Sequence, residues 1–288
     1  MRESAAAIGP QPRFDDRLDR CPLCESTSIR PYLTDHRGIA IDLCRACRVR
    51  FMNPQYTQES LDEYYTRYTS HDPSHIVAAH RGPRRERKRA NLDLLAKHLP
   101  PRARFLGLGC GDGLELTLAK ERGYEVEAYD VDPAAASAVR EATGIEVRTG
   151  DLFTIPLERG AYDCVFLDQV LEHPKDPARY LRRIRDLLRE RAILYLGVPN
   201  LASLSNRWKT LQDRLGVRNG SRKGRHFDTW HHLLYYSPRS LRRVLPQFGF
   251  DVLEVRGDPE STAGTLLRSV RRTVPLLESS MIVIARKR

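Results

Sequence analysis

A glycine-rich run, Phe105–Gly113, constrains the fold of this chain more than any other segment. It reads Phe-Leu-Gly-Leu-Gly-Cys-Gly-Asp-Gly and is followed, seventeen residues after its last glycine, by Asp130. The pattern predicts a buried strand, a tight turn and a helix, then a second strand that ends at Asp130. Glycines let a ligand lie against bare backbone, and an acid at the tip of the next strand can accept hydrogen bonds from a ribose diol. The segment therefore predicts a site for a nucleoside-containing cofactor.

The glycine spacing argues against a dinucleotide as that cofactor. A dinucleotide fingerprint places its third glycine five positions after the first, where this chain has Leu114, and Asp112 would repel phosphates at the helix start. The spacing suits a cofactor that has no phosphate and carries a positive centre. The segment resembles the first motif of class I S-adenosylmethionine-dependent methyltransferases, although a tight turn without a ligand remains an alternative on this motif alone.

Strands and helices alternate from residue 101 onward, which predicts an α/β fold with a doubly wound, mainly parallel seven-stranded sheet. The strands are expected at 103–108, 125–130, 145–148, 162–168, 191–198, 251–256 and 280–286. Helices are expected at 113–122, 133–142, 177–190 and 238–248, with a further helical piece at 264–272. Pro246 should shorten the fourth helix, and the last strand is expected to be antiparallel.

Acidic residues follow consecutive predicted strands. Asp130 ends the second strand, Asp151 follows the third and Asp168 ends the fourth. Ligands of doubly wound sheets bind at the carboxyl ends of the strands. The three acids are therefore expected on one edge, beside the glycine turn.

Further segments carry the resemblance over about two thirds of the chain. Asp163–His173 is similar to the fourth motif of small-molecule class I methyltransferases, and Val198–Asn200 to the end of their fifth strand. His231–Pro238 and Phe248–Phe250 resemble a subfamily in which a four-cysteine ribbon precedes the methyltransferase domain, and whose members act on sugars, nucleotide sugars or natural products. This resemblance implies that the glycines wrap the methionine portion, that Asp130 binds ribose, and that Asp151 and Leu152 hold adenine. The cofactor-binding residues are thus expected to be Gly107, Gly109, Gly111, Gly113, Asp130, Val131, Asp151, Leu152, Asp168 and Gln169.

One position departs from that family. Where its members have an acid two residues before the first glycine, near the cofactor's amino group, this chain has Gly107. Either cofactor binding is weaker here or another group supplies the contact.

Two Cys-x-x-Cys pairs near the N-terminus predict a structural zinc site. Cys21 and Cys24 are separated from Cys44 and Cys47 by nineteen residues, and four thiolates form a closed tetrahedral set that suits zinc. The expected organisation is a disordered tail (1–14), a zinc ribbon (15–55), a helical linker or cap (56–100) and a methyltransferase-like domain (101–288) with a basic insertion (200–236).

Histidines are the candidate general bases for methyl transfer to a hydroxyl. His173 follows the fourth strand, and His231 and His232 precede the last helix; a near-neutral pKa would suit this role. In the insertion, Arg222, Lys223 and Arg225 could clamp a phosphate group, while Tyr235 could orient the substrate. A basic loop facing solvent remains an alternative for this tract, as for the dense Arg and Lys residues of 81–89.

The whole-chain charge predicts an anionic partner without identifying it. The 288 residues carry a net charge of +11, which attracts nucleic acids, phosphorylated small molecules or membrane surfaces. No apolar stretch is long enough to span a membrane and no leader peptide is evident, so a cytoplasmic location is expected. We expect an S-adenosylmethionine-dependent enzyme that methylates a small anionic molecule, with O-methylation slightly preferred. An RNA methyltransferase and a non-catalytic cofactor-binding module are the alternatives.

Overall fold

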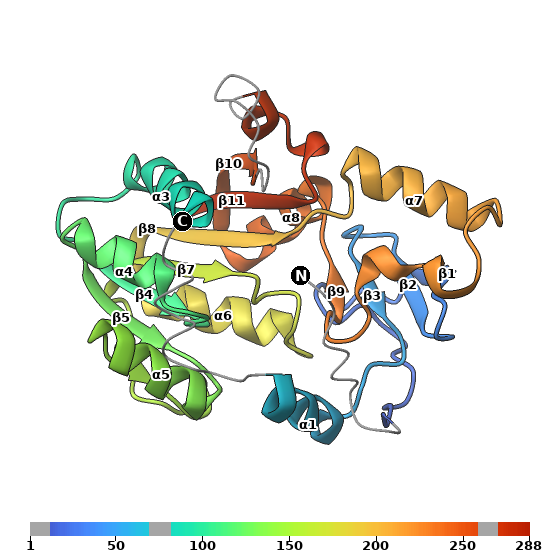
Figure 1. The fold of residues 1–288 in the computed structure, drawn as a ribbon, viewed down its shortest axis with the longest axis horizontal. Coiled ribbons are helices and arrows are strands. Elements are labelled where there is room, and N and C mark those ends of the chain that lie inside the picture. Colours follow the sequence, from blue (N-terminus) through green and yellow to red (C-terminus); the bar gives the residue numbers. More distant parts are fainter. Residues whose placement is uncertain (1–11, 69–81, 259–269) are drawn as a thin grey trace.

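A seven-stranded sheet forms the centre of the larger part of the chain in the computed structural model, which describes residues 12–68, 82–258 and 270–288 (Figure 1). The strand order is β10-β11-β8-β7-β4-β5-β6. The strands are β4 (Arg104–Leu108), β5 (Glu125–Tyr129), β6 (Val147–Arg148), β7 (Tyr162–Asp168), β8 (Leu188–Pro199), β10 (Phe250–Gly257) and β11 (Ser280–Lys287). Strands β4 to β8 pair in parallel, whereas β11 is antiparallel to both β8 and β10. The predicted seven-stranded α/β sheet, including its antiparallel last strand, is therefore confirmed.

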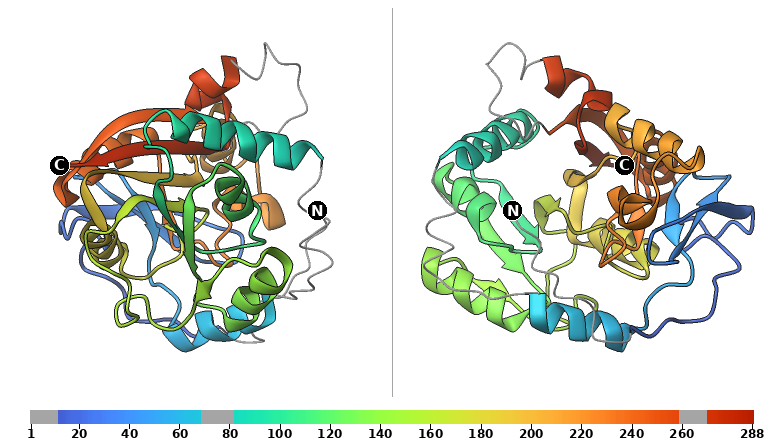
Figure 2. Two further views of the ribbon diagram at one scale, coloured as in Figure 1. Left: turned by 90° about the vertical axis from the view of Figure 1, so that its left-hand side faces the viewer. Right: turned by 45° about the vertical axis from the view of Figure 1, so that its right-hand side comes forward.

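Helices cover both faces of this sheet (Figure 2). On one face α3 (Pro83–Ala96), α4 (Leu114–Glu121) and α5 (Pro133–Thr143) pack on alternate strand residues such as Phe105 and Cys164. On the other face α6 (Pro177–Leu187) and α8 (Pro238–Val244) pack on the intervening residues, such as Leu106 and Val165. The central strands β4 and β7 thus bury both faces, as a doubly wound sheet requires.

Helix ends follow the expected capping residues with one error. Asp176 and Ser237 accept hydrogen bonds from the third residue of α6 and of α8, respectively, and α8 gives way at Leu245 to the 3₁₀ turn η3 (Leu245–Phe248), which contains Pro246. The prediction of a helix through residue 190 was wrong. Leu188 is extended and already pairs with Tyr162, so β8 begins where the helix was expected to continue.

A second sheet of four strands joins the N-terminal segment to the insertion. It has the order β1-β2-β3-β9, with β1 (Ile29–Thr34), β2 (Ala40–Cys44), β3 (Arg50–Met52) and β9 (Leu234–Tyr235). The insertion also contributes α7 (Leu204–Arg214) and the 3₁₀ turns η1 (Gly220–Arg222) and η2 (Arg225–Phe227), and Figure 2 shows it lying beside the N-terminal strands. No local sequence signal indicates that these two segments share a sheet.

The remaining elements belong to the linker and to the segment that precedes β11. The linker contains α1 (Gln58–Tyr68), and the 3₁₀ turn η4 (Pro275–Leu277) precedes β11. Most of the expected tail lies outside the described residues, but Phe14 forms an isolated bridge with Tyr56 and stacks on its ring. Of the helical piece expected at 264–272, only residues 270–272 are described, and they are helical. None of the helices among the described residues is long and apolar enough to cross a membrane.

Candidate functional site

The glycine turn is held against the end of β5. Gly109, Gly111 and Gly113 all have positive φ angles, of 83°, 52° and 73°, a region that side chains with a Cβ rarely adopt. Gly109 donates to the carbonyl of Tyr129 at 2.8 Å, and Cys110 N donates to Asp130 Oδ2 at 2.8 Å. The predicted strand, turn and acid therefore come together as one unit.

The space around this turn fits a nucleoside. A Cβ at Gly111 would meet nothing within 4 Å, so a ligand can approach the backbone there. Val131, beside Asp130, is 64% exposed and offers an apolar surface to a base, while Leu152 is buried beneath the loop that follows β6. Asp151 is anchored by a hydrogen bond from Phe153 N to its Oδ1 at 3.0 Å. An exposed apolar side chain, an acid and open backbone thus lie together beside the turn.

Leu116 occupies the space beside Gly107. A Cβ at Gly107 would lie 2.4 Å from Leu116 Cδ2, so an acid at this position requires the side chain of Leu116 to move. The leucine side chain at position 116 therefore occupies the space that an acidic side chain at position 107 would need.

A buried lysine that was not among the predicted site residues lies next to this turn. Lys88 of α3 is only 6% exposed and pairs with Glu115, at 2.7 Å, and with Asp168. Burial would lower the pKa of Lys88, but the two carboxylates outweigh that effect and raise it. The interpretation of 81–89 as a solvated helix face is wrong at this residue, because Lys88 shares the apolar face of Leu92 and Leu95. Two carboxylates, both paired with Lys88, thus lie at the start of α4 and at the end of β7.

The three candidate histidines converge on the same edge of the sheet. One ring nitrogen from each of His173, His231 and His232 lies within 4.8 Å of the others. The segment that carries His173 touches the glycine turn, since a Cβ at Gly109 would lie 2.5 Å from Val170 Cγ2. The topology therefore brings together bases that are 58 residues apart along the chain.

Burial keeps these imidazoles neutral. It lowers the pKa of His173 to about 3, with a smaller contribution from His231, and lowers the pKa values of His231 and His232 as well. The near-neutral pKa expected for a histidine base is therefore wrong. Each ring is therefore unprotonated at neutral pH, and both ring nitrogens of His173 face backbone carbonyl oxygens, of His231 at 3.2 Å and of Gln169 at 3.1 Å.

Glu172 lies beneath this histidine cluster and is fully buried. Neither of its carboxylate oxygens has a hydrogen-bond partner among the described residues, and His232 Nε2 is 3.9 Å from Oε1. Burial raises the pKa of Glu172 to about 8, so the group holds a proton at neutral pH.

The expected phosphate clamp is a structured turn. Gly224 N donates to Asp213 at 3.0 Å and the carbonyl of Lys223 accepts from His36 N at 2.9 Å, which ties the tract to α7 and to the β1–β2 turn. Arg222 and Arg225 are exposed. Tyr235 is buried and donates to the carbonyl of His232 at 2.8 Å, so its hydroxyl orients the histidine segment.

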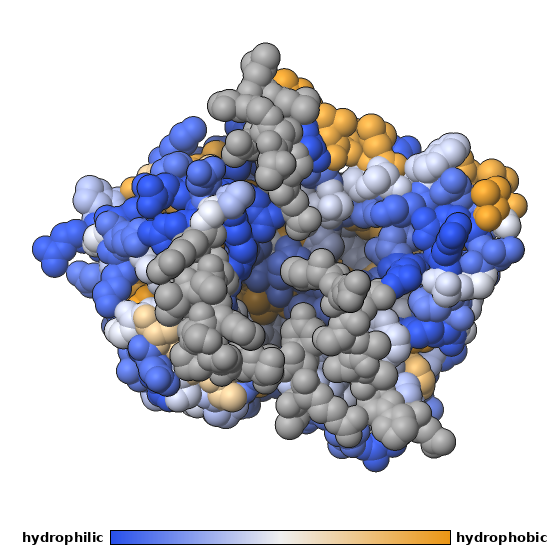
Figure 3. Space-filling model, in the orientation of Figure 1, coloured by the Kyte–Doolittle hydropathy of each residue, from blue (hydrophilic) through white to orange (hydrophobic). Residues whose placement is uncertain are grey.

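Exposed apolar side chains run along α7. Leu204, Trp208, Leu211 and Leu215 are 46–69% exposed, and Figure 3 shows apolar surface gathered over this helix. Trp230, by contrast, lies under the guanidinium of Arg37 at 3.7 Å.

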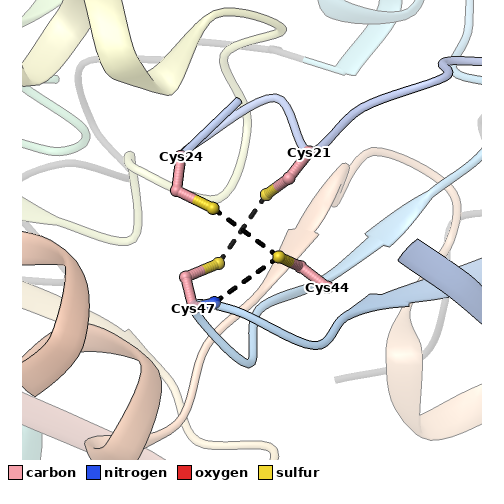
Figure 4. Close-up of side chains that lie close together, drawn as sticks. All are labelled: Cys21, Cys24, Cys44 and Cys47. Carbon is pink, nitrogen blue, oxygen red and sulfur yellow. Dashed lines mark hydrogen bonds between the residues drawn. The ribbon is translucent and has the colours of Figure 1, made fainter. Parts of the chain in front are cut away.

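The four N-terminal cysteines have the geometry of a metal site (Figure 4). Their sulfurs all lie within 4.8 Å of one another, with Cys21 and Cys47 at 3.7 Å and Cys24 and Cys44 at 3.6 Å. Zinc–sulfur bonds of about 2.3 Å in a tetrahedron place sulfurs about 3.8 Å apart. The spacing is far longer than a disulfide bond, and all six cysteines are free. The set therefore fits zinc.

Comparison with known proteins agrees with this geometry. The methyltransferase domain family matches residues 79–255, more than half of the chain. The chain belongs to this family. Its matched part includes the glycine turn, Asp130, Asp168 and the histidine cluster.

The curated relatives match this chain over only part of their own length. The chain is 34% identical over 101 residues to a probable S-adenosylmethionine-dependent methyltransferase of Mycobacterium tuberculosis, covering 35% of this chain and 37% of that protein. It is 29% identical over 116 residues to a ubiquinone biosynthesis O-methyltransferase of Xanthomonas campestris, covering 38% and 48%. The chain thus spans between a third and a half of the length of these two relatives.

Solved structures share the fold. One chain of a complex between a methyltransferase and its activator from Haloferax volcanii matches with a TM-score of 0.51 at 13% identity, covering 75% of this chain and 93% of that one. A methyltransferase-like protein from Bacillus halodurans matches with a TM-score of 0.50 at 16% identity, covering 69% and 98%. At these identities the likeness establishes the sheet architecture alone.

Proposed function

We propose that this protein transfers the methyl group of S-adenosylmethionine to a small anionic molecule, such as a nucleotide-linked or phosphorylated sugar or a natural-product intermediate. Family membership and the fit of the glycine turn and Asp130 to a nucleoside support the cofactor. The observation that carries the proposal is the position of the histidine cluster, which lies on the segment that touches this turn.

The residues of the chain have distinct roles in this proposal. The cofactor supplies an electrophilic methyl group. Asp130 holds the ribose, Val131 and Leu152 border the adenine, and Glu115 and Asp168, balanced by Lys88, receive the cofactor's amino group in place of the missing acid. A neutral imidazole of the cluster accepts the proton of the acceptor hydroxyl as its oxygen attacks. His173 is the first candidate because it follows β7 most directly.

O-methylation is preferred over transfer to carbon or nitrogen. A hydroxyl needs a base in the transition state, and the cluster supplies neutral imidazoles. The Xanthomonas relative is named as an O-methyltransferase, which supports the same preference.

We also propose that Cys21, Cys24, Cys44 and Cys47 bind a structural zinc ion. Four thiolates leave no open coordination position for a substrate. The zinc would stabilise the knuckles that precede β1 and follow β2, and a cytoplasmic location would keep the thiolates reduced.

The first experiment measures cofactor binding by calorimetry. The wild-type protein is expected to bind S-adenosylmethionine, and Asp130→Asn to bind it about 10-fold or more weakly, because charged hydrogen bonds contribute about 1.5–3 kcal/mol. Asp186→Asn, an exposed acid on α6 that pairs with Arg159, is the matched control and should bind as the wild type does. Absence of binding in the wild type would exclude the enzyme.

Labelled methyl transfer into a lysate then separates the alternatives. Label in the small-molecule fraction supports the proposal and identifies the acceptor. Label in nuclease-sensitive RNA would establish the RNA methyltransferase alternative, and cofactor binding without transfer to either fraction would favour a non-catalytic module.

A further inference from the structure

A cavity of about 410 Å³ lies between the N-terminal sheet and the insertion, away from the glycine turn. Five arginines line it: Arg48 and Arg50 from the β2–β3 region, Arg207 and Arg214 from α7, and Arg239 from α8. None of the described residues that line it is acidic. We call these five residues the arginine pocket.

The guanidinium groups of the arginine pocket lack counter-ions. Within residues 12–68, 82–258 and 270–288, none of the five side chains forms an ion pair. A larger cavity of about 670 Å³ near Cys24 gives the contrast, because its Arg182 pairs with Glu25 at 3.3 Å. The positive charge of the arginine pocket is therefore not neutralised by acids of the described residues, unlike that of Arg182 in the larger cavity.

Arg50 bears the largest electrostatic cost. Its Nε is buried and has no hydrogen-bond partner in the described part of the chain. Burial lowers its pKa; Tyr32 opposes this, while the positive charges of Arg48 and Arg214 add to the lowering. Like charges converging at a partly desolvated site favour the binding of an anion.

Tyr32 fixes the two central guanidinium groups. The Cζ atoms of Arg50 and Arg214 lie 4.6 Å and 4.5 Å from the centre of its ring, within the range of a cation–π interaction. An arginine held in this way loses little freedom when it binds an anion, and its planar fork matches phosphate oxygens.

We propose that the arginine pocket binds the phosphate or diphosphate group of a small molecule. Five arginines and no acid can neutralise two or more negative charges, and a cavity of about 410 Å³ has room for a compact anion such as a diphosphate. The anion would be either the non-reacting end of the substrate or a free phosphate compound.

The position of the pocket favours the first source. Leu201 and Ala202, which also line it, come two and three residues after the end of β8 at Pro199. Arg50 pairs in the sheet with Tyr235, three residues after His232. An anchored substrate would thus lie beside the segments that carry the histidine cluster. This assignment rests on the proposed function, and it moves phosphate recognition from Arg222, Lys223 and Arg225 to the arginine pocket.

Calorimetry of the full chain with inorganic pyrophosphate tests the site without cofactor or catalysis. The wild-type protein should bind pyrophosphate, and Arg214→Gln and Arg207→Gln should each weaken binding about 10-fold or more, since each removes a charged hydrogen-bond donor. Arg214→Lys should bind with intermediate affinity. Both arginines are exposed on α7, so the variants are expected to fold, which thermal melting verifies. Arg222→Gln, exposed and outside the pocket, is the matched control and should change affinity less than about 2-fold.

The outcomes separate this site from the proposed function. A wild-type protein that fails to bind pyrophosphate, or equal losses in Arg214→Gln and Arg222→Gln, would overturn the arginine pocket even if S-adenosylmethionine binds. Pyrophosphate binding that depends on Arg214 would sustain it even if no methyl transfer is found. A nucleoside diphosphate that binds more tightly than pyrophosphate would identify the anion as the end of a larger substrate. Loss of single-stranded RNA binding in Arg214→Gln, with pyrophosphate binding unchanged, would contradict the choice of a small molecule.

Discussion

Glu172 is a buried carboxyl group whose two oxygens have no hydrogen-bond partner among the described residues. Its pKa is raised from 4.5 to about 8 by burial. A raised pKa in the folded state gives stability that is complete below the unfolded pKa and is lost as the pH rises through the folded pKa. We therefore expect the free energy of unfolding to fall between about pH 4.5 and pH 8.

Glu172→Gln should remove this pH dependence, because glutamine stays neutral. Urea unfolding at pH 6 and pH 8.5 measures the effect, and the variant should be the more stable protein at pH 8.5. The same change at exposed Glu158 serves as the control. Equal pH dependence in the wild type and Glu172→Gln would show that the carboxyl group is not held neutral.

His173 provides the second prediction, this time on rate. His173→Gln should lower kcat about 10²–10⁴-fold, the usual contribution of a general base, and should leave the affinity for S-adenosylmethionine almost unchanged. His98→Gln, on a histidine that contacts Glu254 at 2.9 Å, is the matched control.

The pH profile of the wild-type enzyme tests the same assignment. Because burial lowers the pKa of His173 to about 3, its imidazole is unprotonated throughout the neutral range. We expect no decline of kcat from a histidine between pH 8 and pH 5. A half-maximal rate near pH 6.5 would contradict the buried, neutral base.

Gly107 gives a prediction that couples stability to cofactor affinity. Gly107→Asp would place its Cβ against the side chain of Leu116 and should destabilise the fold by about 1–3 kcal/mol. In a Leu116→Ala background the side chain has room, so adding Gly107→Asp should tighten S-adenosylmethionine binding there. Chemical unfolding and calorimetry measure the two effects. Unchanged stability of the single variant would show that Leu116 does not exclude the acid.

At the level of elements, the shared sheet links the cysteines to the insertion. The strand β3 pairs with β9 through Arg50–Tyr235 and Phe51–Leu234, and β2 ends in Cys44. Cys24→Ser should therefore cause a loss of amide hydrogen-exchange protection in β2, β3 and β9 together, with β4 and β5 still protected. Ser26→Ala, in the same knuckle, is the control. Loss of protection confined to the N-terminal strands would show that β9 does not depend on the metal site.

The sequence predicted most elements of the large sheet because their signals are local. Alternating burial, capping residues such as Asp176 and Ser237, and glycines with positive φ depend on neighbours within a few positions. The strand β9 has only two residues, and its partner β3 lies more than 180 positions earlier. No local pattern distinguishes such a strand from a buried loop.

The residues of the candidate site also fall into two groups: those with a local sequence signal and those that depend on contacts between distant segments. The glycine turn, Asp130 and the four cysteines are recognisable from spacing. Lys88 could have been found from its position on the face of Leu92 and Leu95. The raised pKa of Glu172 and the arginine pocket depend on burial and on contacts between distant segments, which composition and spacing do not specify.

On the scale of the whole molecule, the net charge of +11 must be separated from specific anion recognition. Delocalised charge attracts any polyanion, and this attraction weakens steeply with salt because phosphate contacts release counter-ions. In the proposed cofactor site, binding would depend on short hydrogen bonds to Asp130 and apolar contact with Val131, so the affinity should respond little to salt.

We therefore expect a single-stranded RNA of about 20 nucleotides to bind weakly at about 50 mM KCl and to lose almost all affinity by about 300 mM. The affinity for S-adenosylmethionine should change less than about 2-fold over the same range. Fluorescence anisotropy and calorimetry in matched buffers measure the two. Poly-glutamate of similar charge is the control and should follow the RNA, since both would respond to net charge alone. RNA binding that persists at high salt while poly-glutamate dissociates would mean that the protein binds nucleic acid specifically. That result would favour RNA over a small molecule as the methyl acceptor.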